Sequence, residues 1–593
     1  MAGRKTWEAS AHQLGTSCLR RASRHYCVPQ AAAFFFERRA VCAAYRHSSL
    51  SCTIVSVHCT GMVHPNAGAQ GAELLFCGSC KWDTQGRDRK GAIEYGEEVL
   101  APHRLTGSVT LGGLTTPADR AQMLRIVSGP VAAHAVLILT DGRALAIGRN
   151  THGELGIGTA RRFAPVFMPV VFIKGGRCTG AACGRTHTLF LMDDGVVYAT
   201  GANDAGQLGV GARGISASGA NVPAAVTPIR LTYLAEHMGV RAAQVGCGEQ
   251  FSVVLADDGS LYTFGTHRDG VLGLGTTGEV IGKQRMEVES EPLPRRVTRF
   301  VRSDGIVVAL DESKSMDEQS EDIPRFTQVV CGQRHVVALD SRHRVWSWGF
   351  GGYGRLGHRT PNDELRPRCM EFFERLRDDR RRCVKLYAGA SCCYALTEMG
   401  TVYFWGITKM TGEATTSPQM LYDLHGWKIR DIAVGISSTM IACEECTTIA
   451  WGPSPAYGEM GFGETVVGRS FAGRTGVLKS STQPRIVDPL KGVQVSQLAM
   501  GAFFTFLLIR PEEVQASDDQ GTKVQALPTL SWDAHANIGA QPVRGLTILD
   551  ASSLGSRRGR KPGKVAARAT SSATKTRVTS VSAVVVPEKR RRT

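Results

Sequence analysis

The sequence lacks any run of apolar residues that approaches the roughly 18 needed to cross a membrane as a helix. No membrane insertion is therefore expected. The 17 cysteines show no spacing typical of a disulfide framework, and no credible secretory signal accompanies them. Scattered thiols of this kind indicate a reducing compartment.

Acidic residues are scarce at both ends of the chain. Residues 1–62 hold eight Lys and Arg against two acids, and residues 555–593 hold twelve against one. These two segments account for the whole formal charge of +17, so the part between them is neutral. The basic character, and with it any attraction to polyanions, lies in the two ends.

Between these ends a short unit recurs, best seen in residues 327–358. It contains a short apolar strand, a glycine, a second alternating strand, a polar turn, a third strand ending in Trp348-Gly349, and a glycine loop that closes on Leu356-Gly357. Alternation with a period of two, bounded by turn residues, predicts half-buried antiparallel strands. The unit is therefore expected to be a small sheet.

Seven copies of the unit can be traced. The glycine after the first strand stands at Gly129, Gly184, Gly248, Gly332, Gly389, Gly435 and Gly501. The glycine that ends the third strand stands at Gly78, Gly148, Gly201, Gly265, Gly349, Gly406 and Gly452. The two series are out of step, because the chain begins with a second half and ends with a first half. This predicts an all-β fold, a seven-bladed β-propeller closed by its N- and C-terminal strands.

Domain boundaries follow from where the repeat begins and stops. The propeller is expected over residues 74–510, with an insertion at 276–324 that should lie on a propeller face. Residues 511–593 are expected to form a disordered basic tail, since their Ser-, Thr-, Lys- and Arg-rich end cannot bury a core.

Several residue patterns invite a chemical interpretation that their context does not support. The glycine loops follow strands but precede no helix, so a phosphate-binding loop is not expected. His134, His187 and His335 share one repeat position that is Phe251 or Phe504 in other copies, which favours a structural hydrogen bond over catalysis. The pairs Cys77/Cys80 and Cys443/Cys446 have zinc-like spacing, but nothing brings them together. No enzyme activity, metal or cofactor is expected.

Longer strings within the repeat resemble the regulator of chromosome condensation family, whose members are seven-bladed propellers. They are CKWDTQGR from Cys80, CGRTHTL from Cys183, VWSWGFGGYGRLGH from Val345, LHGWKIR around Trp427 and IAWGPSPAYGEMGFG from Ile449. The resemblance covers residues 74–510 and is strongest to one branch of the family. It implies a non-enzymatic scaffold of mitosis and cell spreading that associates with chromosomes, centromeres and spindle microtubules. It also implies binding of small GTPases of the Rac, Ral or Arf type, in some members as a guanine-nucleotide exchange factor.

Repeat geometry suggests which loops would meet such a partner. The residues expected at the contact are Asn150, His152, Asn203, Asp204, His267, Arg268, Tyr353 and Arg355, with Arg295, Arg296 and Arg299 from the insertion. The protein is expected to act as a monomer.

Two basic clusters in the tail suggest a second contact. They are Arg557, Arg558, Arg560, Lys561 and Lys564, and then Lys589, Arg590, Arg591 and Arg592. Such clusters serve as nuclear import signals, and the first also resembles an Arg-Gly-Arg hook for AT-rich minor grooves. DNA and acidic tubulin tails attract the same charges, so both remain open as partners. A nuclear location is expected, with chromosome or spindle association in mitosis.

The N-terminal segment leaves a different compartment open. Residues 1–62 are rich in arginine and poor in acids, a pattern compatible with a mitochondrial presequence. An unstructured extension, or upstream translation ahead of a working start at Met62, explains the same composition. The alternative function is therefore an imported mitochondrial propeller that serves organellar RNA or ribosome assembly.

Overall fold

A computed structural model describes residues 71–549 apart from 83–97, 173–174, 212–222, 282–285, 377–380, 409–412, 454–455, 464–465, 468–475, 511–518, 539, 541–542 and 544–545. The predicted N-terminal extension 1–62 and the tail clusters from Arg557 to Arg592 lie outside the described residues. None of the helices in the described part of the chain has the length and apolarity to cross a lipid bilayer.

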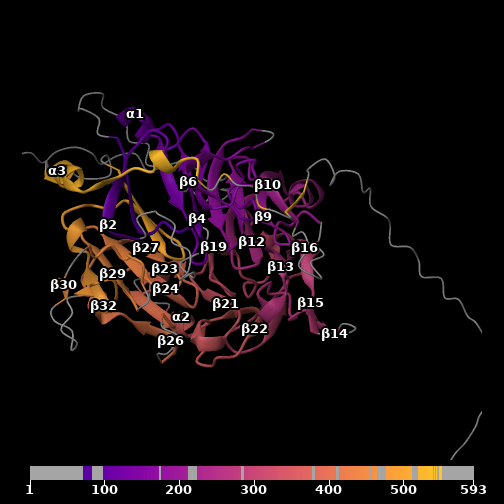
Figure 1. Cartoon of the computed structure of the whole chain (residues 1–593). Helices are drawn as coiled ribbons and strands as arrows, with labels where there is room; N and C mark the ends of the chain where they lie inside the picture. Colours follow the sequence, from indigo (N-terminus) through magenta and orange to yellow (C-terminus); the bar gives the residue numbers. More distant parts are fainter. Residues whose placement is uncertain are drawn as a thin grey trace, which may run out of the picture. The chain divides into compact units, whose positions relative to one another are not determined.

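Seven antiparallel sheets, each built on four strands, form the fold (Figure 1). From innermost to outermost strand, blade 1 is β33 (Gln497–Met500), β34 (Phe504–Ile509), β1 (Glu73–Ser79) and β2 (Glu98–Leu105); blade 2 is β3 (Met123–Val127), β4 (His134–Leu139), β5 (Ala144–Arg149) and β6 (Phe163–Pro169); blade 3 is β7 (Cys178–Cys183), β8 (His187–Met192), β9 (Val197–Ala202) and β10 (Pro223–Arg230); blade 4 is β11 (Ala242–Cys247), β12 (Phe251–Ala256), β13 (Leu261–Thr266) and β16 (Ser290–Arg296). Blade 5 is β19 (Phe326–Cys331), β20 (His335–Asp340), β21 (Val345–Gly349) and β22 (Glu364–Cys369); blade 6 is β23 (Cys383–Ala388), β24 (Cys392–Thr397), β25 (Val402–Gly406) and β26 (Thr415–Met420); blade 7 is β27 (Ile429–Val434), β28 (Thr439–Cys443), β29 (Thr448–Gly452) and β32 (Ser481–Ile486).

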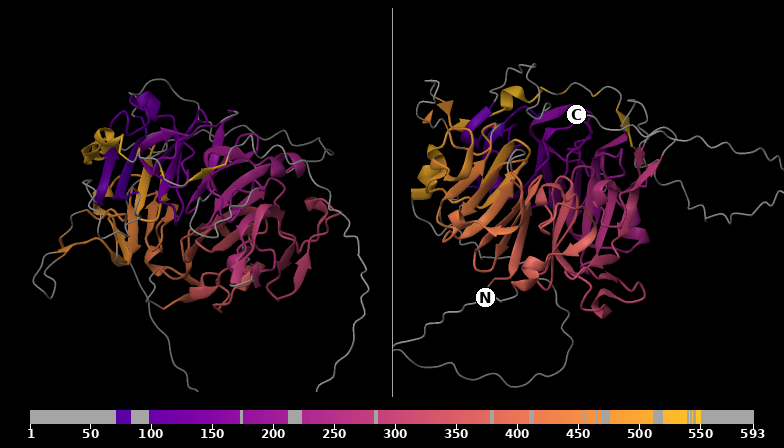
Figure 2. Two further views of the ribbon diagram at one scale, coloured as in Figure 1. Left: turned by 45° about the vertical axis from the view of Figure 1, so that its right-hand side comes forward. Right: turned by 90° about the horizontal axis from the view of Figure 1, so that it is seen from below.

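The ring is closed within blade 1, where the two ends of the repeat region meet. Strand β1 pairs with β34 in antiparallel register, with Leu74 opposite Leu508 and Phe76 opposite Phe506. Each innermost strand lies beside the innermost strand of the next blade, from blade 1 round to blade 7 and back. The predicted seven-bladed propeller and its closure are confirmed. Figure 2 shows the chain colours running round the blades, with the orange end against the indigo start.

Side-chain amides connect neighbouring blades around the central cavity, which has a volume of about 350 Å³ and is lined by all seven innermost strands. The Gln244 amide donates to Val329 O and accepts from Val329 N, both at 2.9 Å. Gln328 makes the same pair of bonds to Leu386, and Gln497 makes it to Ile126 at 3.0 and 3.1 Å. These bonds occupy backbone groups that an inner edge strand would otherwise leave unpaired.

Glycine at the end of the third strand is required by the backbone. Gly148 has φ +113°, and a Cβ there would lie 2.5 Å from the O atom of Ala133, the residue just before the neighbouring strand β4. The pairing register of β5 with β6 shifts at this residue, as in a β-bulge. The repeated glycine seen in the sequence therefore marks the point where each blade bends.

The outermost strand of every blade contains proline. The residues are Pro102, Pro165, Pro169, Pro223, Pro228, Pro292, Pro294, Pro367, Pro418 and Pro484. Proline cannot donate to a further strand, so it is tolerated at a sheet edge and discourages pairing with another chain.

The segment expected as one insertion has two parts. Its beginning contains a hairpin of β14 (Glu279–Ile281) and β15 (Met286–Val288), and then β16, which is a regular outer strand. The part that exceeds the repeat is β17 (Arg299–Val301), β18 (Val307–Ala309) and the 3-10 helix η3 (Met316–Glu318). Strand β17 pairs in parallel with β22, so this part extends the outer edge of blade 5. Strand β16 is hard to recognise in the sequence because it contains proline, a residue typical of loops.

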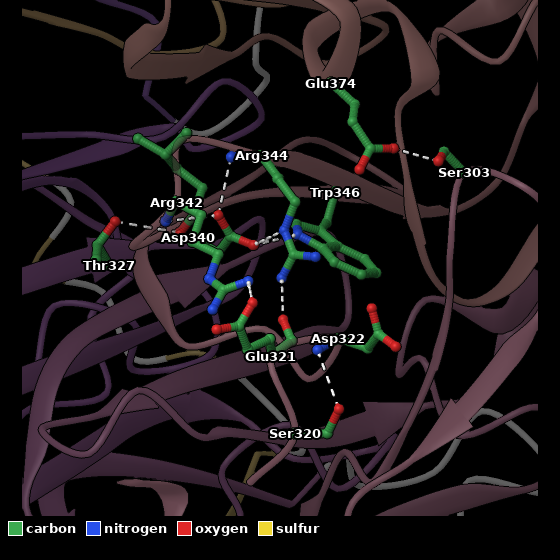
Figure 3. A network of polar contacts seen from close by, with 11 residues as sticks. Ser303, Ser320, Glu321, Asp322, Thr327, Asp340, Arg342, Arg344, Trp346 and Glu374 are labelled. Carbon is green, nitrogen blue, oxygen red and sulfur yellow. Dashed lines mark hydrogen bonds and ion pairs between the residues drawn. The ribbon is translucent and has the colours of Figure 1, made fainter. Parts of the chain in front are cut away.

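A buried carboxylate organises the turn beneath this added part (Figure 3). Asp340 is 1% exposed and accepts hydrogen bonds from Arg344 Nε at 2.6 Å and Trp346 Nε1 at 3.0 Å. Its other oxygen accepts from the backbone N of Arg342 and of Arg344. Arg342 in turn contacts Glu321 at 3.1 Å, which links the added segment to the blade.

Replacing Asp340 by asparagine is expected to lower the free energy of unfolding by about 2 kcal/mol or more. The amide keeps one acceptor oxygen but turns an NH2 donor toward donors that the other carboxylate oxygen accepted from, and the charge that balances buried Arg344 is lost. Chemical denaturation measures this change. Glu321→Gln, which removes an exposed ion pair, is the control and should cost less than about 1 kcal/mol. Equal losses in the two variants would contradict the assigned role of Asp340.

The chain after Arg510 departs from the expected disordered tail. Residues 519–549 contain α3 (Asp519–Ala526), β35 (Thr529–Leu530), the 3-10 helix η8 (Asp533–His535) and β36 (Thr547–Ile548). We call this segment the strap. It pairs in parallel with β2 of blade 1 and, further on, with β10 of blade 3, so it runs along the outside of the ring (Figure 1, yellow).

Candidate partner-binding face

Two kinds of loop meet at one end of the blades. Antiparallel strands place the turn between the first and second strands at the same end as the loop between the third and fourth. We call this end the loop face. The turns between second and third strands, and the connections from one blade to the next, lie at the opposite end.

Two of the predicted contact residues hold the glycine loops together from inside. Asn150 is fully buried, accepts from Leu155 N at 3.0 Å and donates to the carbonyls of Thr159 and Arg161. Asn203 is also fully buried and accepts from Leu208 N at 3.0 Å. Both side chains are enclosed by their own loops, so the structure leaves them no surface for a partner.

The other predicted loop residues differ in exposure. His152 and Asp204 are half-buried, and Asp204 accepts from the amides of Gln207 and Gln250. His267 is 7% exposed and lies 4.0 Å from Glu291. Arg268 is exposed on the loop face.

Blade 5 contributes the last two predicted loop residues. Tyr353 is 37% exposed, whereas Arg355 is 3% exposed. The loop face therefore offers Arg268 and Tyr353 most directly to a partner.

The three arginines predicted from the insertion do not join this face. Arg295 and Arg296 belong to the outer strand β16, and Arg296 Nη2 donates to Ser260 Oγ at 2.8 Å in a turn at the opposite end. Arg299 begins β17 at the outer edge of blade 5. The eleven predicted residues therefore do not form one site. Arg295 and Arg296 lie on strand β16 and Arg299 on strand β17, away from the loop face.

An arginine–aromatic cluster on blade 5 includes residues that the sequence did not single out. The centre of the Phe350 ring lies 4.4 Å from the guanidinium group of Arg334 and 4.7 Å from that of Arg355. Arg334 Nε donates to Asp269 Oδ2 of blade 4 at 2.6 Å. Arg334 lies in the turn before β20 and Phe350 in the loop after β21, so only the folded blade brings them together.

The shared histidine position makes hydrogen bonds between blades, in agreement with the structural interpretation. His134 Nε2 is 2.7 Å from Thr188 Oγ1, His187 Nε2 is 3.0 Å from Ser252 Oγ, and His335 Nε2 is 3.0 Å from Cys393 Sγ. All three rings are fully buried. Burial lowers the pKa of His134 to about 3 and that of His187 to about 4, and it lowers the pKa of His335 well below its usual value. These rings are neutral at physiological pH.

The cysteines of the described residues are free thiols, and nearly all are buried. Burial raises the pKa of Cys80 and of Cys443 to about 12. No group of three or more His, Cys, Asp or Glu side chains suited to a metal ion occurs within the described ranges.

Known proteins share both the repeat and the fold. The sequence profile described as regulator of chromosome condensation (RCC1) repeat matches residues 141–191, 194–255 and 342–396. The chain is 36% identical to "Protein RCC2 homolog" of Danio rerio over 465 residues, which cover 77% of this chain and 83% of that protein. It is 35% identical to "Protein RCC2" of Homo sapiens over 464 residues, 77% and 79% of the two chains.

Solved structures of lower sequence similarity share the architecture. The crystal structure of Prp20p from Saccharomyces cerevisiae superposes with a TM-score of 0.54 at 15% identity, covering 77% of this chain and 95% of that one. Its title names binding properties to Gsp1p and histones. At this identity the similarity supports the seven-bladed fold alone.

Proposed function

The chain belongs to the regulator of chromosome condensation repeat family, and on that premise we propose that it is a propeller scaffold that binds a small GTPase through its loop face. The GTPase would be of the Rac, Ral or Arf type. The protein would bind it without catalysing any covalent reaction. If exchange occurs, it follows from tighter binding to the nucleotide-free GTPase than to the loaded form, which lets the nucleotide leave.

An exposed apolar hairpin is the observation that carries this proposal. The hairpin β14–β15 interrupts the loop between the third and fourth strands of blade 4, so it belongs to the loop face. Ile281 at its end is 93% exposed. A large apolar side chain left in water, on the same face as the exposed Arg268, suits a protein contact, where such groups become buried.

A nucleotide-release assay with the full chain tests the proposal. Fluorescent GDP is loaded on a panel of Rac, Ral and Arf GTPases, and binding of each GTPase is measured in parallel by calorimetry. We expect at least one to bind, and Ile281→Asp to weaken that binding about tenfold or more without changing the melting temperature. Arg143→Gln, at an exposed turn on the opposite end, is the matched control and should bind as wild type.

The outcomes separate the two parts of the proposal. Binding without faster release would leave a scaffold and remove the exchange activity. Absence of binding to every GTPase in the panel, or equal binding by Ile281→Asp, would refute the loop-face contact.

We propose that the basic tail from Arg557 to Arg592 supplies the second contact, with chromatin or microtubules, and nuclear import. Its net charge predicts weak binding that falls steeply with salt. The arginine-rich composition of residues 1–62 supports the mitochondrial alternative. Imaging the protein with and without residues 1–62, together with mapping its N-terminus, separates the two locations.

A further inference from the structure

Arg355 is a buried cation without an acidic partner. It is 3% exposed, its Nε donates to Gly352 O at 2.9 Å, and its Nη1 donates to Ala390 O at 3.4 Å. No carboxylate of the described residues lies within ion-pair distance of it. Burial, with a smaller contribution from the nearby Arg334, lowers the pKa of Arg355 to about 10. A buried charge balanced by carbonyl groups and aromatic rings, with no carboxylate, destabilises the fold.

The fold itself does not require this charge. The residue at the same place in the other glycine loops is Glu154 in blade 2, Gln207 in blade 3, Val271 in blade 4 and Glu459 in blade 7. Val271 is 1% exposed, so an uncharged side chain fills the same position in the neighbouring loop. A costly group that the architecture can replace is a candidate for function.

Tyr353, which packs on the Arg355 guanidinium, is aromatic and has a strained backbone conformation. The Tyr353 ring centre lies 5.7 Å from the Arg355 guanidinium, and the ring is partly exposed to solvent. Tyr353 also has φ +63°, a left-handed conformation that a bulky residue rarely adopts. Local strain of this kind is found where a segment takes part in binding.

The charge balance of the arginine–aromatic cluster indicates the charge of the group that it would bind. Of the two guanidinium groups that contact the Phe350 ring, that of Arg334 is neutralised by Asp269. The cluster therefore keeps one uncompensated positive charge, that of Arg355. One carboxylate balances it, whereas a doubly charged phosphate would leave an excess negative charge.

We propose that Arg355 is the receptor for a carboxylate side chain of a docking protein, with the Tyr353 ring as the cover that moves aside and then packs on the incoming chain. This deepens the loop-face contact of the proposed function by naming its chemistry. The carboxylate proposal rests on the proposed function only for the identity of the partner protein.

Saturation-transfer NMR with the full chain tests the proposal without any GTPase. The probes are the peptides acetyl-Gly-Glu-Gly-amide and acetyl-Gly-Gln-Gly-amide. We expect saturation of the Glu side-chain protons, a signal at least about fivefold weaker for the Gln peptide, and a similar loss of the Glu signal in Arg355→Val. Arg143→Gln should keep the wild-type signal.

A melting-temperature measurement accompanies the binding data. Arg355→Val is expected to melt at or above the wild-type temperature, because valine already occupies the equivalent position in blade 4. If the variant melts lower, Tyr353→Asn decides the question, since asparagine tolerates the left-handed conformation and the ring is partly exposed. It should lose the Glu signal while remaining folded.

The proposal is overturned if the Glu and Gln peptides give equal signals, or if the folded variants bind the Glu peptide as wild type does. Because both probes are small peptides, these results are independent of whether any GTPase binds.

Discussion

Replacing Trp532 by alanine is expected to lower the free energy of unfolding by about 3–5 kcal/mol, the range for removing a buried large aromatic side chain. Trp532 is 4% exposed although it lies in the strap, outside the repeats. Its ring centre is 5.1 Å from that of Phe76 in edge-to-face geometry and 6.3 Å from that of Trp82. The residue thus completes the core of blade 1, where the ring closes.

Hydrogen bonds fix Trp532 in this position. Trp532 N donates to Thr110 Oγ1 at 2.7 Å, and Asp533 Oδ1 accepts from both Thr110 N and Thr110 Oγ1 at 2.6 Å. Chemical denaturation of the full chain measures the loss. Ile548→Ala, at a half-exposed residue of the same strap, is the matched control and should change stability by less than about 0.5 kcal/mol. A wild-type denaturation midpoint for Trp532→Ala would show that the strap does not support the closing blade.

Acidification from pH 6.5 to 5.5 is expected to remove up to about 4 kcal/mol of stability, through three fully buried histidines and the half-buried His358. Burial lowers the pKa of His134 and His358 to about 3 and that of His187 to about 4, and it holds that of His335 well below its usual value. An unfolded histidine titrates near 6.5. Between these values the unfolded chain binds more protons than the folded one, so stability is present above pH 6.5 and falls with pH.

The share of a single histidine can be measured. Each contributes about 1 kcal/mol between pH 6.5 and 5.5. His187→Phe should remove that share from the pH dependence, because Phe251 occupies the same position in the next blade. Denaturation at several pH values between 5.5 and 7.5 gives the slope. Ser252 keeps its hydrogen bond to Gln207 O at 2.8 Å in this variant. An unchanged slope would mean that His187 is protonated in the folded protein.

The number of blades and their closure could be predicted from the sequence because the glycines of the turns mark each repeat. Gly148 and its equivalents are needed for backbone reasons, so their spacing reports the repeat directly. The strap was missed for the opposite reason. Its two strands are two residues long, and its anchor is a single tryptophan, so no periodicity marks it.

The candidate site could be predicted only in part. Repeat spacing places Asn150 on a loop, but its burial depends on hydrogen bonds to Thr159 and Arg161 that the spacing does not reveal. The contact of Arg334 with Phe350 joins a turn and a loop that are separate in the repeat. Residue type and spacing therefore identified the face, and only the folded chain sorts its side chains into scaffold and contact.

The strap has a mechanical consequence. Its far end is held to β10 by a pairing of two residues, Pro223 with Thr547 and Ala224 with Ile548, whereas its near end is held by the buried Trp532. Tension on the chain beyond residue 549 would therefore pull the weak attachment loose first. The force would reach the pairing of β1 with β34, where the ring closes, only after the strap had detached from β10 and straightened.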